Sequence, residues 1–488
     1  MALIETVRAE RLEKITILKD AGMDSYPART GRTHTVDQFL ENHGTLEKNS
    51  EQVVLAGRVM SLREHGGSLF VDIFDGAKGQ CFVQRDKLGG TSFNLFTDTV
   101  DTGDIIEFTG SAFTTKRGQP SLGITEWRML AKSLRPLPDE WYGIKDEDER
   151  FRKRYLDILL TKDLSERIKR RSKFWNVIRS YLLDRDFIEV ETPVLETATG
   201  GADARPFETH HNALDIDVYL RISVGELWQK RLMVAGLPKV FEIGRVFRNE
   251  GMSAEHAQDY TAMECYEAFK DYEAGMEMIT DLYRTIADKI YNTRVFSIKD
   301  FTIDLDKEWE IYDFCALMQE AYGFDPRDSD IKTENLYKLL ELEKEGISVP
   351  EVSEIGRMVD LLWKKIRKGL AGPGFLINVP VYLEPLAKKS TKDPRVVERF
   401  QVMIAGSEIG KGFSELNDPV DQAERFKHQQ QLRDAGDEEA QMPDAEFVES
   451  LEYGMPPAFG FGVSERLFDF FENVSIREGQ IFPLMRPR

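Results

Sequence analysis

The chain has 488 residues with a formal net charge of −20, and 41% of its residues are hydrophobic while 31% are charged. This length is too great for one hydrophobic core and predicts two or three domains of an ordinary globular protein. The negative charge disfavours non-specific binding to nucleic acid, and no run reaches the ~20 apolar residues of a membrane span.

The cysteines and the first residues indicate where the protein works. Cys81, Cys265 and Cys315 lie far apart and form no metal-ligand spacing, which favours a reducing, cytoplasmic setting. Charges interrupt the first apolar residues every few positions, so we expect no secretory leader.

The N-terminal third predicts a helix followed by a small barrel. An amphipathic helix is expected at residues 5–22, within an N-terminal helical extension of residues 1–50. Five short strand patterns separated by Gly and Asp follow between residues 53 and 130. The commonest five-stranded barrel is the OB-fold, so we predict an OB-fold domain at residues 51–137 and a linker at residues 138–150.

One barrel strand, SLFVDIF, carries an aromatic side chain on its outer face. Period-two alternation points Leu69, Val71 and Ile73 inward and Phe70 outward. An exposed aromatic on an OB strand can stack on a base, which is worth roughly 1–3 kcal/mol per base. Gln80 on the next strand can hydrogen-bond a base edge. The alternative is a stray surface aromatic, and in this context we favour the stacking platform.

The remaining residues, 151–488, predict an α+β domain built on an antiparallel sheet. A helix is expected at residues 164–185, followed by a strand broken at Pro193. Residues of about 275–370 have a mostly helical pattern, and strand-like runs return at 375–383, 399–415 and 457–463. Helices alternating with hairpins, without a βαβ rhythm, are typical of this class.

The segment FRNEGMSAEHAQDYTAMECYEAF, residues 247–269, predicts a polar pocket. Arg248 and Glu250 precede its loop, and alternation places Tyr260, Glu264 and Tyr266 on one face of the returning strand. Burying these polar and charged side chains without water or a hydrogen-bonding partner would cost free energy. An arginine can hold a phosphate and an aromatic ring can stack on a base. From this segment alone, an exposed hairpin with incidental charges is an equal alternative.

Two further segments carry candidate ligand-binding residues. In GFGVSER, residues 460–466, the glycines allow a ligand close to the backbone and Arg466 follows at the start of a helix. In SEIGKGFSELND, Glu408 and Glu415 either bind a cation or raise each other's pKa, unless the segment is an exposed edge strand. Strict alternation places these glutamates on opposite faces. If both face one site, a bulge at Gly410 or Gly412 is required.

Together these segments resemble the three signature motifs of class II aminoacyl-tRNA synthetases. The resemblance extends to the lysyl-tRNA synthetase family, through RYLDIL, EVETPVLE, GGADARPFETHHNALDIDVYLRIS, FRNEG, FSELNDPVDQAERF, LEYGMPP and IFPLMRP. With the N-terminal segment and the barrel it covers almost the whole chain. It implies a class II catalytic domain at residues 151–488, with about 275–370 as a largely helical insertion.

The resemblance implies an ATP site and a magnesium ion that bridges the phosphates. Arg248 and Arg466 match catalytic phosphate contacts, and a positive group there neutralises charge that develops as the amino-acid carboxylate attacks phosphorus. Glu408 matches a metal ligand. The residues that match ATP contacts are Arg248, Glu250, His256, Tyr260, Glu408 and Arg466.

The resemblance also implies an L-lysine pocket and an anticodon site. An ε-ammonium removed from water needs carboxylates, with an apolar wall for the methylenes. The residues that match or adjoin lysine contacts are Gly201, Glu226, Arg248, Glu264, Tyr266, Lys411, Phe413 and Glu415. The residues that match anticodon contacts are Arg58, Phe70, Gln80 and Glu126.

Two positions depart from the family pattern. Gln401 stands where a second metal-binding glutamate is usual, so one magnesium site should be weaker or differently built. Lys411 stands where an asparagine is usual, which places a cation beside a pocket for a cation unless it pairs with Glu408 or the substrate carboxylate.

The predicted function is activation of L-lysine with ATP, followed by transfer of the lysyl group to the 3′ end of tRNA(Lys). The family resemblance of the helix before Pro193, whose apolar stripe needs a partner, implies a homodimer. Three alternatives are a related ligase for a lysine analogue, aspartate or asparagine, a lysine ligase acting on a protein, and a non-catalytic regulatory protein. Glu264 and Glu415 disfavour an anionic side chain, because like charges would be desolvated together.

Overall fold

The computed structural model describes residues 2–138, 144–251, 253, 256–328, 331–342 and 355–487. The chain divides between residues 161 and 162 into two compact units. The predicted linker at 138–150 and the predicted insertion at 275–370 each fall partly outside the described residues. In the part of the chain that the structure describes, none of the helices has both the length and the apolar character needed to cross a membrane.

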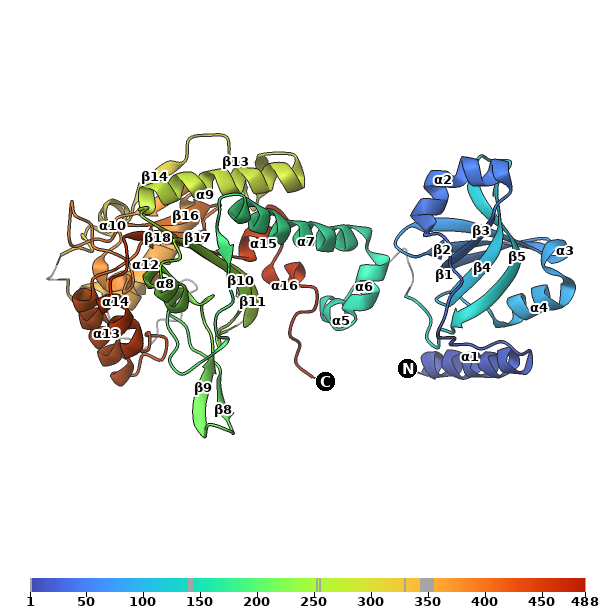
Figure 1. Cartoon of the computed structure of the whole chain (residues 1–488), viewed down its shortest axis with the longest axis horizontal. Coiled ribbons are helices and arrows are strands. Elements are labelled where there is room, and N and C mark those ends of the chain that lie inside the picture. The colour runs from blue at the N-terminus through green and yellow to red at the C-terminus, as the bar shows by residue number, and fades with distance from the viewer. Residues whose placement is uncertain are drawn as a thin grey trace. The chain divides into compact units, whose positions relative to one another are not determined.

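Unit 1 is built around a closed five-stranded barrel with the strand order β1-β2-β3-β5-β4 (Figure 1). Its strands are β1 (Gln52–His65), β2 (Ser68–Phe74), β3 (Lys78–Gln84), β4 (Ile105–Thr114) and β5 (Pro120–Ala131). Its helices are α1 (Ala2–Asp20), α2 (Val36–Asn49), α3 (Arg85–Leu88), α4 (Gly90–Thr99), α5 (Glu147–Arg152) and α6 (Arg154–Leu160). The predicted strand count and the N-terminal helix are confirmed.

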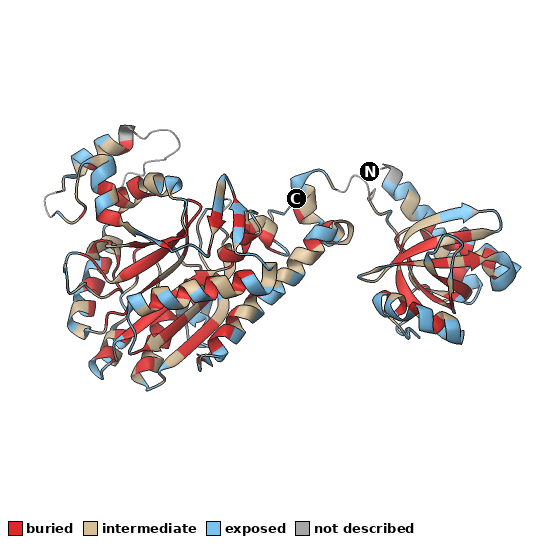
Figure 2. Ribbon diagram, turned by 90° about the horizontal axis from the view of Figure 1, so that it is seen from above, coloured by how far each residue is buried: buried red, intermediate tan, exposed pale blue. Residues whose placement is uncertain are grey.

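The barrel interior follows the predicted alternation. Leu69, Val71 and Ile73 are buried, whereas Phe70 lies outside and is half-buried. Figure 2 shows the buried residues concentrated on the barrel strands, with exposed positions on the helices around them.

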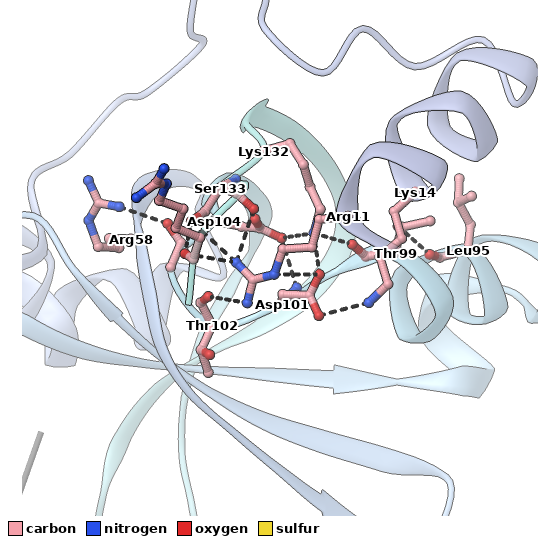
Figure 3. Close-up of polar contacts among 12 residues, drawn as sticks. Arg11, Lys14, Arg58, Leu95, Thr99, Asp101, Thr102, Asp104, Lys132 and Ser133 are labelled. Atoms are coloured by element: carbon pink, nitrogen blue, oxygen red, sulfur yellow. Dashed lines mark hydrogen bonds and ion pairs between the residues drawn. The ribbon is translucent and has the colours of Figure 1, made fainter. Parts of the chain in front are cut away.

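A fully buried lysine links the last barrel strand to the loop before β4 (Figure 3). Lys132 Nζ lies 2.8 Å from Asp104 and 2.5 Å from Asp101, and it donates to the Thr99 carbonyl at 2.6 Å. A buried ammonium is tolerated only when it is paired and hydrogen-bonded, and here both conditions are met.

The same loop holds helix α1 against the barrel. Arg11 on α1 is 5% exposed and donates to the carbonyls of Thr102 and Ser133, and Lys14 lies 2.7 Å from Asp101. These contacts fix a helix whose own apolar face is weak.

Unit 2 is built on an eight-stranded sheet with the order β14-β15-β16-β17-β18-β11-β10-β6. Its neighbours are antiparallel except for the pairs β14–β15 and β10–β6 at the edges. The strands are β6 (Ile188–Glu189), β10 (Lys239–Phe247), β11 (Asp259–Ala268), β14 (Glu310–Asp313), β15 (Gly374–Ile377), β16 (Arg399–Ile404), β17 (Ser407–Ser414) and β18 (Ala458–Ser464). The α+β class with a mainly antiparallel sheet is confirmed.

Smaller sheets and helices complete unit 2. The small sheets consist of β7 (Leu195–Glu196), β8 (Glu208–His211) and β9 (Ile216–Leu220), and of β12 (Val295–Ile298) and β13 (Phe301–Asp304). The helices are α7 (Lys162–Leu183), α8 (Glu226–Val234), α9 (Tyr272–Ile286), α10 (Phe314–Tyr322), α11 (Thr333–Leu342), α12 (Ile355–Ile366), α13 (Pro419–Asp434), α14 (Ala445–Glu452), α15 (Arg466–Phe471) and α16 (Ile476–Gly479), with short helices η1 (Ala287–Tyr291), η2 (Arg367–Gly369) and η3 (Val381–Leu383).

Two hydrophobic cores cover the two faces of the large sheet. Helices α7 and α9 pack on one face, where Gly275 on α9 allows close approach because a Cβ there would lie 2.1 Å from the Phe459 ring. Helices α8, α10 and α12 contribute to the core on the other face. On the second face, these helices leave strands β11, β17 and β18 free to line a pocket.

Two sequence-based expectations need correction, and a third holds with an addition. The expected stripe of α7 is Ile168, Trp175, Ile178 and Leu182, and it does not need a partner subunit, because Ile178 and Leu182 are buried in the chain's own core and Trp175 packs against it. The run 375–383 is a strand only to Ile377 and ends in the short helix η3. The region 275–370 is mostly helical as expected in its described residues, and it also contains the short strands β12, β13 and β14.

Replacement of Lys132 by methionine should destabilise unit 1 by about 3 kcal/mol, because it leaves two carboxylates without their buried cation. Hydrogen-exchange mass spectrometry on the full chain, applied to peptides from residues 52–131, measures this loss. Lys14→Met is the matched control, since its side chain is 25% exposed and its loss should cost less than about 1 kcal/mol. Equal protection in the two variants would contradict the assignment.

Candidate active site

A pocket of about 300 Å³ gathers residues from 201 to 476 on unit 2. Every residue predicted for ATP or lysine contacts lines it, and so does Gln401. These residues are Gly201, Glu226, Arg248, Glu250, His256, Tyr260, Glu264, Tyr266, Gln401, Glu408, Lys411, Phe413, Glu415 and Arg466. The structure thus brings together segments that are more than 200 positions apart in the sequence.

The β10–β11 hairpin aligns the first group of these side chains. Val246 pairs with Tyr260 and Glu242 pairs with Glu264, so the predicted shared face is confirmed. Arg248 follows the end of β10, where its Nε donates to the Ile222 carbonyl at 3.3 Å. Its guanidinium carbon lies 5.7 Å from the centroid of the Tyr260 ring. A cation and an aromatic ring therefore stand side by side in the pocket.

The predicted bulge is present on β17. Gln401 pairs with Lys411 but Met403 pairs with Glu408, so β17 carries one extra residue. Gly410 has φ +150°, and a Cβ there would lie 2.7 Å from the Tyr283 hydroxyl oxygen. Because of this bulge Glu408 and Glu415 both line the pocket, although strict alternation would place them on opposite faces.

Three carboxylates, Glu226, Glu264 and Glu415, form a carboxylate cluster in the pocket wall. Lys230 Nζ lies 2.7 Å from Glu226 and 2.5 Å from Glu415. Glu264 accepts the Val224 amide at 2.7 Å and the Tyr266 hydroxyl at 2.9 Å. The cluster combines an internal cation with backbone and hydroxyl donors.

Burial and repulsion oppose ionisation of two members of this cluster, Glu264 and Glu415. Burial, followed by repulsion from Glu226, raises the pKa of Glu264 to about 7. Burial also raises the pKa of Glu415 to about 8, because repulsion by Glu226 and Glu264 adds to it and Lys230 only partly compensates. Burial acts to lower the pKa of Lys230, but its two carboxylate partners raise it above the ordinary value. Lys230 therefore stays charged, and the cluster favours a further cation.

Glycine at position 460 is required by the cluster. A Cβ on Gly460 would lie 2.0 Å from Glu415 Oε1 and 2.6 Å from Tyr266 Cε1. The strand β18 can thus support the pocket floor only without a side chain at this point.

The Lys411 ammonium is paired inside the pocket. Its Nζ lies 2.6 Å from Glu384, whose carboxylate is also 3.1 Å from Arg399. Although burial opposes ionisation of Glu384, Arg399 and Lys411 together hold its pKa below the ordinary value. Lys411 was expected to pair with Glu408 or with substrate, and the structure instead provides Glu384.

Glu408 and Gln401 differ in their ability to bind a metal ion. Mg²⁺ is usually bound by one or two carboxylates together with substrate phosphates, so Glu408, which accepts the Trp363 indole N–H at 2.8 Å, fits one ion. Gln401 does not fit, because its Oε1 accepts from the Arg399 guanidinium, which would repel a cation. Within the described ranges, no three His, Cys, Asp or Glu side chains are grouped so as to hold a metal by themselves.

The predicted anticodon residues lie on the barrel of unit 1. The Phe70 ring stacks on Phe82 at 4.5 Å between centroids, and Gln80 accepts the Ser121 hydroxyl at 2.9 Å. Arg58 donates to the Gly103 carbonyl at 2.8 Å, and Glu126 is exposed. Phe70 and Gln80 share one outer face, whereas Arg58 is already engaged with the barrel itself.

Family comparisons agree with this geometry. Residues 146–486 match the family described as tRNA synthetases class II (D, K and N). The chain belongs to this class II synthetase family. Residues 53–137 match the OB-fold nucleic acid binding domain, which confirms the predicted barrel type.

Several curated relatives of this synthetase carry the name lysine–tRNA ligase. The relative from Thermosipho melanesiensis is 40% identical and is aligned over 99% of this chain and 97% of its own length. The relative from Roseiflexus sp. (strain RS-1) is 40% identical over 99% of both chains. That from Thermoanaerobacter sp. (strain X514) is 42% identical over 100% of this chain and 97% of its own.

Sequence reasoning missed Lys230, Glu384 and Arg399. Lys230 stands four residues after Glu226, a spacing that places both side chains on one face of a helix and could have indicated the pair. No local pattern indicates Glu384, because its partners Arg399 and Lys411 come from strands that follow it in the chain.

Proposed function

We propose that this chain activates L-lysine with ATP and transfers the lysyl group to the 3′ end of tRNA(Lys). The observation that carries the proposal is the carboxylate cluster inside a class II synthetase pocket, with Tyr266 and Phe413 beside it. Carboxylates in low dielectric attract ammonium groups, and an aromatic ring packs against methylenes. An anionic amino-acid side chain would be repelled by the same wall.

Arg248 and Arg466 are proposed to hold the reacting groups. Both side chains line the pocket, although the two residues lie far apart in the sequence. The substrate carboxylate attacks the α-phosphorus, pyrophosphate leaves, and the arginines stabilise the negative charge that develops on the phosphate oxygens. This step needs no general base, because the carboxylate is already ionised.

The remaining nucleotide contacts follow from the chemistry of each side chain. Tyr260 offers a ring for the adenine, Glu250 an acceptor for its amino group, and His256 a contact for the γ-phosphate. Glu408 would hold Mg²⁺ together with the ATP phosphates, and the ion would supply charge neutralisation between those phosphates.

The lysine contacts divide between the two ammonium groups. We assign the ε-ammonium to Glu415, Glu264 and Tyr266, with Phe413 beside the methylenes. We assign the α-ammonium to Glu226 and the backbone of Gly201. Support comes from the shared pocket wall and from the charge of these groups.

The barrel is proposed to bind the anticodon of the tRNA. Phe70 would stack on a base and Gln80 would bond its edge, with Arg58 and Glu126 as flanking contacts. The family match of the barrel to a nucleic acid binding domain supports this assignment.

We propose that the protein works in the cytoplasm as a homodimer. The support lies in apolar side chains that remain exposed around β6 and β7, rather than in the α7 stripe. These are Leu183, Ile188, Val194 and Leu195, each more than 40% exposed. A second copy of the chain could cover them.

The proposal is tested by amino-acid-dependent exchange between ATP and pyrophosphate, run with each of the twenty amino acids and Mg²⁺. Exchange should occur with lysine and stay at background with the other nineteen, because only lysine offers two ammonium groups at this spacing. Exchange with a different amino acid would overturn the substrate, and no exchange with any would overturn the reaction.

Lysine binding should strengthen as pH rises from 6 to 8. In the free enzyme Glu264 and Glu415 have pKa values of about 7 and about 8, so they hold protons that the ammonium groups must displace. Ligand cations favour the ionised form, so the KM for lysine should fall as pH rises, most steeply below pH 7 where both groups hold protons, and should level off above pH 8. The KM for ATP should not follow this trend. A flat lysine profile would contradict it.

Phe70→Ala should raise the KM for tRNA about tenfold, which corresponds to the loss of one stacking contact. Exchange without tRNA should be unchanged, because Phe70 belongs to unit 1. Aminoacylation kinetics measure the first effect, and Phe269→Ala, which truncates a 76% exposed aromatic of unit 2, is the control. Equal tRNA KM values for both variants would remove Phe70 from the anticodon site.

A further inference from the structure

Lys230 stands behind the carboxylate cluster, outside the pocket lining. It lies on α8, its side chain is 1% exposed, and its Nζ contacts Glu226 at 2.7 Å and Glu415 at 2.5 Å. The same atom lies 5.3 Å from the centroid of the Phe413 ring. Its two acidic partners face the pocket, whereas Lys230 itself does not.

The charge of the cluster is set by this lysine. Glu226, Glu264 and Glu415 contribute three negative charges when ionised, and Lys230 removes one, so two remain for a ligand. Lysine carries two ammonium groups, while its carboxylate has Arg248 as a separate partner in the pocket. Without Lys230, a bound lysine would leave one carboxylate unpaired, and a buried unpaired charge is costly.

We propose that Lys230 is a positioning residue that determines specificity: it leaves the carboxylate cluster with two negative charges, which match a diamino acid. This inference rests on the proposed lysine activation and deepens it. An amino acid with a neutral side chain would supply only one of the two positive charges and would leave a carboxylate unpaired. Lys230 would also hold the glutamates of the α-ammonium and ε-ammonium contacts at a fixed separation.

Charge-altering variants separate this role from mere support of the fold. Glu415→Gln reduces the cluster to one negative charge, and the double variant Lys230→Met with Glu415→Gln returns it to two. We compare wild type, E415Q, K230M and K230M/E415Q by ATP–pyrophosphate exchange with lysine and with norleucine, which lacks the ε-ammonium.

The selectivity ratio, kcat/KM for lysine over kcat/KM for norleucine, should follow the net charge of the carboxylate cluster together with Lys230. It should fall by about 100-fold in E415Q, because the pocket then matches one ammonium group. The double variant should regain at least about tenfold of that loss. A structural lysine would give the opposite order, because the second substitution would only add damage.

Folding of the variants is controlled in two ways. K230M alone leaves two carboxylates without their cation, so it is expected to be the least stable. The double variant removes one cation and one anion together, and the main test therefore uses it. Lys132→Met removes an equally buried lysine from unit 1 and should leave the lysine KM unchanged. The KM for ATP reports an intact nucleotide site in each variant.

Each remaining outcome decides the question. A double variant that is no more selective than E415Q, or a K230M enzyme whose lysine KM stays within about twofold of wild type, overturns the role of Lys230 alone. Wild-type enzyme without lysine-dependent exchange overturns both this role and the proposed function.

Discussion

The pocket depends on the need to compensate charge that has been taken out of water. Glu415 is 1% exposed and Glu226 is 6% exposed. The ion pair between Glu415 and Lys230 joins the residue that follows strand β17 to helix α8. Removing one member of such a group leaves an uncompensated charge in a low dielectric. The site therefore needs α8 and β17 in place together. This requirement ties the ligand-binding wall to the packing of the sheet.

The same constraint explains the two departures from the family pattern. A cation at Lys411 would oppose binding of a second cation nearby, but Glu384 neutralises it and is in turn held by Arg399. Arg399 also donates to the side-chain oxygen of Gln401, for which a neutral amide is suitable. These four residues form one connected network in which each charge has an opposite partner. A substitution at one position has consequences for the others.

The barrel of unit 1 uses an equivalent arrangement for a different purpose. Lys132 and Asp104 are both fully buried, and Asp101 extends the group toward Lys14 on α1. In unit 1 the buried lysine fixes a helix and a loop around the barrel. In unit 2 the buried lysine faces carboxylates that are available to a ligand. The two arrangements differ because the carboxylate partners of Lys230 line a pocket, whereas those of Lys132 hold the helix and the loop.

The sequence by itself determined the fold class, the five barrel strands and the faces of the two hairpin strands, and its resemblance to the family indicated the residues that line the pocket. Local periodicity sufficed for the strands, because residues 69–73 of β2 and the residues within β10 and within β11 alternate with a period of two. The spacing of Glu408 and Glu415 required a bulge, which the structure places beside Gly410. Only the tertiary structure decided that α7 buries its stripe within its own unit, that Glu384 pairs with Lys411, and that Lys230 bridges Glu226 and Glu415. These outcomes depend on contacts between segments far apart in the chain, and a buried charge takes its partner from whichever segment the fold brings near.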